Sequence, residues 1–72
     1  MMKPWRTVSR EQLTQWIREA ALLAWMDSYD MWLTNRLKEG WSEEEANEFL
    51  ETFSSEISKE KIHLVDWLNV NV

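Results

Sequence analysis

The sequence contains no cysteine, one glycine and one proline among its 72 residues. A chain without cysteine forms no disulfide, and no cluster of metal-binding residues suggests a structural zinc site. One glycine and one proline leave too few turn-forming residues for the tight hairpins of a small β-protein. These absences favour an all-α protein, and at this length such a protein needs very good helix packing or oligomerisation for stability.

Long apolar segments are also missing. The longest uninterrupted one covers residues 20–26, whereas a membrane-spanning helix needs about 20 apolar residues. Residues 1–6 lack the apolar segment of a signal peptide. Together with the lack of cysteine, this predicts a soluble, cytoplasmic protein that has no membrane partner.

Residue patterns that carry chemistry are absent too. The chain has no cysteine nucleophile, no serine and histidine pair imposed by helical spacing, and no glycine-rich loop for phosphate. The one histidine, His63, shares a helix face with Glu60 and Asp66, but a single histidine with two carboxylates on an acidic face is typical of a solvated surface. The sequence therefore predicts a protein that is not an enzyme and that holds no cofactor or metal.

The chain has, in contrast, a hydrophobic fraction of 44% and six tryptophans, which predict a folded single domain over residues 1–72. Ser9 and Gln12 form a capping-box pattern that starts a helix after an extended lead-in over residues 1–8. No glycine or proline follows until Gly40, which suits the left-handed residue after a helix end. We therefore predict a first helix over about 10–38.

A second capping box begins at Ser42 and has Glu45 at its third helical position. An apolar stripe continues from there to Leu68, which predicts a second helix over about 43–68 and a frayed tail over 69–72. A break at Ser58 is the alternative. One short connection between two long helices makes an antiparallel helical hairpin.

The apolar stripe of the first helix changes sides near residue 22. A straight helix with this pattern meets two different neighbours, while the alternative is a break near Asp27 and Ser28 with a new N-cap there. The first neighbour would be the second helix, and we expect a second copy of the chain to cover the other stripe, giving a homodimeric bundle. This predicted dimer or partner interface consists of Leu22, Trp25, Met26, Tyr29, Trp32, Leu33 and Leu37.

The net charge is −5, with basic residues concentrated in 1–18 and acidic residues in 39–72. In an antiparallel hairpin these ends lie side by side. The expected pairs are Arg36 and Lys38 with Glu43 and Glu44, and Arg10 and Arg18 with Glu56, Glu60 and Asp66.

Tryptophans at helix edges and the acidic start of the second helix indicate a second surface for a protein partner, because tryptophan is frequent in binding hot spots. The simpler interpretations are that Trp5 packs on the following helix and that the acids complement the helix dipole. The residues of this possible partner surface are Trp5, Trp41, Glu43, Glu44, Glu48 and Glu51.

The function predicted from these features is that of a small acidic protein-interaction module, a homodimeric regulator or adaptor for an unidentified protein. One alternative is a nucleic-acid-binding module that uses the basic residues Lys3, Arg6 and Arg10. Another is an acidic competitor that occupies a nucleic-acid-binding site on its partner.

Overall fold

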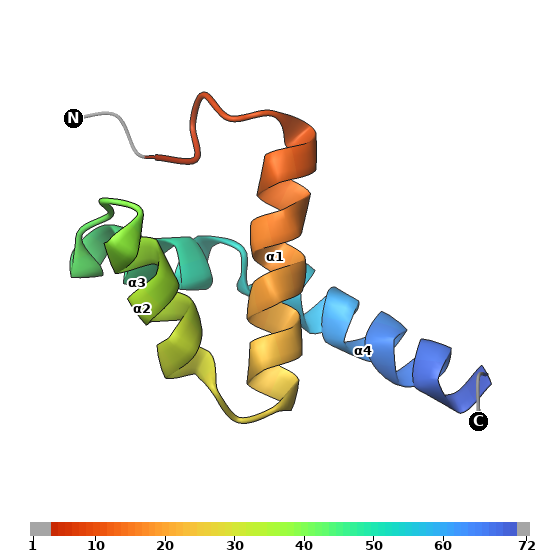
Figure 1. Cartoon of the computed structure of the whole chain (residues 1–72). Coiled ribbons are helices and arrows are strands. Elements are labelled where there is room, and N and C mark those ends of the chain that lie inside the picture. Colours follow the sequence, from red (N-terminus) through yellow and green to blue (C-terminus); the bar gives the residue numbers. More distant parts are fainter. Residues whose placement is uncertain (1–3, 71–72) are drawn as a thin grey trace.

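The computed structural model describes residues 4–70, and of residues 65 and 67–70 it describes the backbone alone. The described chain is all-α, as predicted, and Figure 1 shows α4 crossing α1 and extending beyond the other helices. Lys3, the side chain of Trp67 and residues 71–72 of the predicted tail lie outside the described residues. The helices are α1 (Arg10–Trp25), α2 (Tyr29–Lys38), α3 (Glu43–Thr52) and α4 (Ser54–Val70).

The predicted continuous helix over 10–38 is wrong, and the alternative break near Asp27 and Ser28 is confirmed. Asp27 has a φ of 58°, in the left-handed region. Its N–H donates to the Ala24 carbonyl at 3.1 Å, and the Ser28 N–H donates to the Leu23 carbonyl at 2.7 Å. This pair of bonds is a Schellman motif, which satisfies the last carbonyls of α1 while the chain turns. The turn brings Trp32 of the second apolar stripe into the same core as the first stripe, while much of the second stripe stays exposed.

Gly40 ends α2 with the same motif and has a φ of 100°, so its predicted left-handed conformation is confirmed. The Gly40 N–H donates to the Leu37 carbonyl and the Trp41 N–H to the Arg36 carbonyl, both at 3.1 Å. The chain is then reversed within two residues, and α3 can pack back against α2.

The capping box at the start of α3 is also confirmed. Ser42 Oγ accepts from the Glu45 N–H at 3.1 Å, and Glu45 Oε1 accepts from the Ser42 N–H at 2.9 Å. At the start of α1, Ser9 Oγ accepts from the Gln12 N–H at 3.1 Å. Both helix starts were encoded by residues that lie within one turn of each other.

The second predicted helix is divided at Phe53, not at Ser58, and its second part continues to Val70. Phe53 turns inward, with its ring centroid 4.6 Å from that of Phe49. The Phe53 carbonyl accepts from the Ile57 N–H at 2.9 Å, which restarts the helical hydrogen bonding in a new direction. The two long helices of the predicted hairpin are thus four shorter helices, and α1 packs against both α2 and α4.

Aromatic side chains from the N-terminal lead-in, from α1, α2 and α3, and from the turn between α2 and α3 fill the core. Phe49 of α3 lies at its centre, stacked on Trp32 at 5.0 Å and edge-on to Trp5 at 5.4 Å. Trp16 of α1 meets Trp41 edge-on at 4.9 Å. Such offset and edge-on pairs are the favoured arrangements of aromatic rings, so this cluster fixes how α1, α2 and α3 sit together.

Candidate interaction surface

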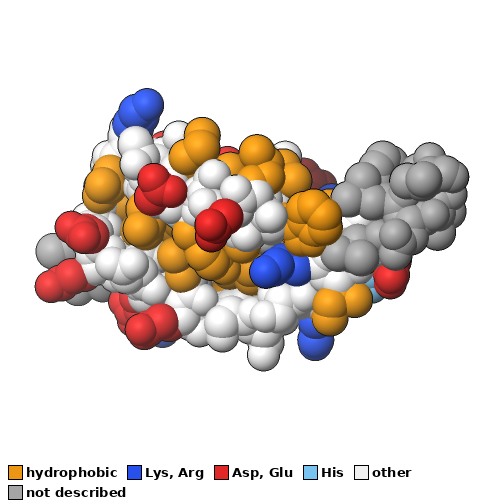
Figure 2. All heavy atoms as spheres, turned by 90° about the horizontal axis from the view of Figure 1, so that it is seen from below, with side chains coloured by type: hydrophobic (Ala, Val, Ile, Leu, Met, Phe, Trp, Pro, Cys, Tyr) orange, Lys and Arg blue, Asp and Glu red, His pale blue; other side chains and the backbone are white. Residues whose placement is uncertain are grey.

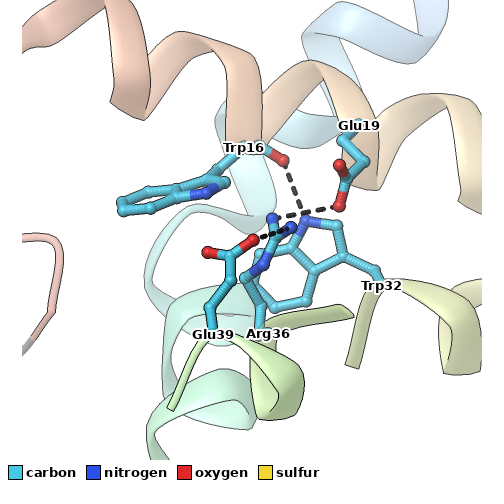
Figure 3. A network of polar contacts seen from close by, with 5 residues as sticks. All are labelled: Trp16, Glu19, Trp32, Arg36 and Glu39. Carbon is cyan, nitrogen blue, oxygen red and sulfur yellow. Dashed lines mark hydrogen bonds and ion pairs between the residues drawn. The ribbon is translucent and has the colours of Figure 1, made fainter. Parts of the chain in front are cut away.

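The core contains one charged side chain among the described residues, Arg36 of α2, which is only 3% exposed. Its Nη2 donates to Glu39 Oε2 at 2.7 Å, and its Nη1 lies 3.0 Å from Glu19 Oε2 on α1. The guanidinium carbon lies 5.1 Å from the Trp32 ring centroid and 5.9 Å from that of Trp16. Figure 3 shows Arg36 between the two carboxylates and beside both indoles.

This network ties α2 to α1. The Trp32 Nε1–H donates to the Trp16 carbonyl at 3.0 Å in the same place. The contact between Arg36 Nη1 and Glu19 Oε2 is an ion pair without hydrogen-bond geometry, and Arg36 Nε is buried with no hydrogen-bond partner. Arg36 and its two carboxylate partners together carry a net charge of −1, and their contacts join α2 to α1.

The observed ion pairs test the predicted charge pairing. Arg18 Nε lies 3.6 Å from Glu60 Oε2, which confirms that the first helix approaches this part of the chain. Arg36 does not pair with Glu43 or Glu44, because the bend at residue 27 turns it into the core toward α1.

Leu22, Trp25, Met26 and Tyr29 are exposed around the turn between α1 and α2, and we call these four residues the apolar corner. Their exposed fractions lie between 41% and 58%. Figure 2 views the molecule from this side and shows hydrophobic side chains gathered on it, with acidic side chains among them. Partial burial raises the pKa of the Tyr29 phenol above its ordinary value of 10.0. The corner is a sizeable apolar surface on a small protein.

The corner comprises four of the seven residues of the predicted interface. Leu37 is exposed on α2 as well, and Leu33 is partly buried. The predicted place of Trp32 in the interface is wrong, because its side chain is fully buried in the core of the single chain. The prediction placed Trp32 on a straight helix, whereas the bend turns this side of α2 inward.

The prediction that Trp5 and Trp41 lie on a partner surface as its anchors is also wrong. Both are buried, and their ring centroids lie 5.5 Å apart. Trp41 is carried into the core by the turn at Gly40, and Trp5 folds over it from the N-terminal lead-in. On α3, Glu43, Glu44 and Glu51 are exposed, and Glu48 is partly buried.

Of the basic residues of the nucleic-acid alternative, the structure describes Arg6 and Arg10. Arg6 and Arg10 are exposed, but Trp5, the aromatic residue beside them in the sequence, packs its ring against Phe49 and Phe53. Bases bound by a single-stranded nucleic-acid site stack on accessible rings. The burial of Trp5 therefore weakens this alternative.

A groove next to the apolar corner was not predicted. It has a volume of about 580 Å³ and lies between α1 and α4, where Leu22 and Leu64 provide apolar surface. The one signal for this groove in the sequence was the expected attraction between Arg18 and Glu60, because that attraction brings α1 and α4 together. The groove is lined by Arg18, Glu19, Leu22, Glu60, His63 and Leu64.

Other kinds of site find no support in the described part of the chain. There, no three histidine, cysteine, aspartate or glutamate residues are placed to hold a metal ion. None of the described helices has the length and apolar character to cross a membrane. Comparison of the sequence with protein-family models and curated proteins, and of the structure with solved structures, gives no significant match.

Proposed function

We propose that the chain is a small acidic protein-interaction module that associates with a second copy through the apolar corner and acts as a regulator or adaptor in the cytoplasm. The observation that carries this proposal is the exposure of four large apolar side chains within residues 22–29. Single exposed hydrophobic residues are ordinary on protein surfaces, whereas a contiguous group of them marks an interaction site.

The corner offers area and no reaction chemistry. Its four side chains each expose about 100 Å², or roughly 400 Å² together, which is half of the ~800 Å² that each partner contributes to a standard interface. Trp25 and Tyr29 are residue types that anchor interfaces. These properties support binding rather than catalysis.

The size of the chain supports a second copy as the occupant. A domain of this length buries only about 60% of the surface that its unfolded chain exposes. Part of the core is already devoted to Arg36, whose burial has a desolvation cost. Covering the apolar corner with another copy would add the apolar burial that the single chain lacks.

Sedimentation velocity over a concentration series tests the proposal. We expect the wild-type chain to change from 8.7 kDa to twice that mass by tens of micromolar. The variant Leu22→Ser with Met26→Ser should stay monomeric and folded, while Ile62→Ser, which removes an exposed apolar side chain of α4 outside the corner, should associate like the wild type. A wild-type chain that stays monomeric throughout contradicts the proposal.

A further inference from the structure

We infer that the regulated partner presents a basic amphipathic helix, which binds the apolar corner and the adjoining groove between α1 and α4 in place of the second copy. This inference rests on the proposed function of a regulator or adaptor. It adds to that function the chemical class of the partner.

Corner and groove form one surface on one side of α1. Arg18, Leu22 and Trp25 follow one another at spacings of four and three residues, which places them on the same helix face. Leu22 belongs to the corner and also lines the groove. At 1.5 Å per residue, residues 18–25 extend over about 10 Å, which is the length of two turns of a partner helix. A helix with apolar side chains at spacings of three and four residues fits a surface of this kind.

The corner is acidic as well as apolar. Asp27 and Asp30 flank it and are exposed, and no lysine or arginine lies between residues 18 and 36. Among the described residues, neither carboxylate has a cation within ion-pair distance. A lysine or arginine beside the apolar face of a partner helix would therefore meet two unpaired carboxylates.

The groove does not offset this negative charge. Its two carboxylates are paired, Glu60 with Arg18 and Glu19 with the buried Arg36, so it offers no surplus base to an acidic occupant. Together, the corner, the groove and the adjoining hollow carry five acids and two bases, a net charge of −3. These charged residues are Glu19, Asp27, Asp30, Glu56 and Glu60 against Arg18 and Lys59.

The same charges favour a basic helix over a second copy. Two corners in contact bring Asp27 and Asp30 of both copies together, and like charges across an interface lower its affinity. A basic helix has the opposite charge and should displace the second copy. The dimer would then keep the corner covered until the partner binds.

The corner also has residue types that suit a foreign helix. Trp25 and Tyr29 can act as anchors. Met26 is 58% exposed, and its flexible thioether side chain adapts to differently shaped partners. The corner of roughly 400 Å² with part of the groove corresponds to the small interfaces of transient complexes, so we expect a Kd in the micromolar range.

A synthetic helical peptide of leucine and lysine is the probe. It has about 14 residues, with leucines at spacings of three and four and lysines at the other positions. Calorimetry should show micromolar binding that weakens about tenfold between about 50 mM and about 500 mM salt. A peptide with glutamate in place of lysine should bind at least about ten times more weakly. A peptide of the same composition with leucines all around the helix should also bind more weakly.

Removal of the two carboxylates tests where the peptide binds. Asp27→Asn with Asp30→Asn should bind it about five times more weakly than the wild type. Glu43→Gln with Glu44→Gln is the matched control, because it removes two exposed carboxylates from the first turn of α3. This control should bind the peptide like the wild type. Circular dichroism checks that both variants keep their helices.

The apolar contact has its own variants. Leu22→Ser with Met26→Ser should lose the peptide, whereas Ile62→Ser should keep it. Sedimentation and native mass spectrometry of the wild type should show the dimer replaced by a complex of one chain and one peptide.

The possible failures are distinguishable. A wild-type dimer that the peptide does not displace, or peptide binding that the aspartate changes leave unaltered, overturns the inference alone. A wild-type chain that stays monomeric yet binds the peptide through Asp27 and Asp30 overturns the proposed self-association and supports the basic helix as the occupant of this surface.

Discussion

The Trp32 indole on α2 donates a hydrogen bond of 3.0 Å to the backbone carbonyl of Trp16 on α1. The two residues are 16 positions apart, so in one continuous helix they would be separated by about 24 Å along the axis. The bond exists because the chain turns at Asp27, and both indoles are then buried in one core. The hydrogen bond between Trp32 and Trp16 therefore depends on the break between α1 and α2, and it holds these two helices together in the core.

Trp32 should be among the most sensitive positions for stability. It is 0% exposed, and Trp32→Phe removes both the hydrogen bond and part of the packed ring. We expect a loss of about 2 kcal/mol in the free energy of unfolding, and of about 4 kcal/mol for Trp32→Ala. Urea unfolding followed by circular dichroism at a concentration where the chain is monomeric measures both, with Trp25→Phe as an exposed control that should change stability by less than about 0.5 kcal/mol. Equal losses at positions 25 and 32 would contradict this core.

Arg36 and Glu19 should be energetically coupled. Arg36→Ala leaves the buried Glu19 Oε2 without its cation and should cost about 3 kcal/mol. Adding Glu19→Gln removes the unpaired charge, so the double variant should regain at least ~1 kcal/mol relative to the sum of the single changes. A double-mutant cycle by urea unfolding measures this coupling.

Arg18 provides the control for that cycle. Its side chain is exposed and lies 3.6 Å from Glu60, so Arg18→Ala should cost less than about 1 kcal/mol. An Arg36→Ala variant as stable as Arg18→Ala would show that the buried network does not position α1 and α2.

The two left-handed helix ends should respond in opposite directions. Gly40→Ala puts a side chain where φ is 100° and should lower stability by about 1 kcal/mol, although no atom lies close enough to clash. Asp27→Gly relieves the same kind of strain at a φ of 58° and should raise stability by up to ~1 kcal/mol. Thermal unfolding compares the two variants with the wild type. A stabilising Gly40→Ala would contradict the Schellman geometry.

Tyr29 should make stability fall in alkaline solution. Burial raises the pKa of its phenol in the folded chain above 10.0, so the folded state holds this proton more firmly than the unfolded state does. The contribution to stability is therefore complete below the unfolded pKa and is lost as the pH rises through the folded pKa. Because Tyr29 is the one tyrosine, its ionisation is visible in the ultraviolet absorbance.

We expect the absorbance titration of the folded chain to have a higher midpoint than that of the chain in urea. Tyr29→Phe should remove this part of the alkaline destabilisation. Identical midpoints in the folded and unfolded chains would mean that Tyr29 is not partly buried at the corner.

The helix ends could be predicted from the sequence where the signal is local. Ser9, Ser42 and Gly40 act on groups within a few residues, and the structure confirms each of them. The two breaks are different. The change of side of the apolar stripe predicted the break at Asp27 only as an alternative, and a helical wheel, which assumes a straight axis, gives no signal for the break at Phe53.

The candidate site was predicted only in part, because the prediction assumed a straight helix. The four residues of the apolar corner lie within about one turn of the break, so the bend leaves all four exposed, as the prediction had them. Trp32 lies further beyond the break and rotated into the core. Trp5 and Trp41 lie outside the helices, where periodicity gives no direction, and their burial depends on rings of α1 and α3 that are distant in the sequence.

The central claim is that the buried tryptophans hold the fold while Trp25 holds two copies together. Sedimentation equilibrium of Trp25→Ala beside the wild type tests it most directly. We predict a wild-type dimer at tens of micromolar and a Trp25→Ala monomer that keeps the helix content and the monomer stability of the wild type. A wild-type monomer, or a Trp25→Ala variant that dimerises as tightly as the wild type, would contradict the claim.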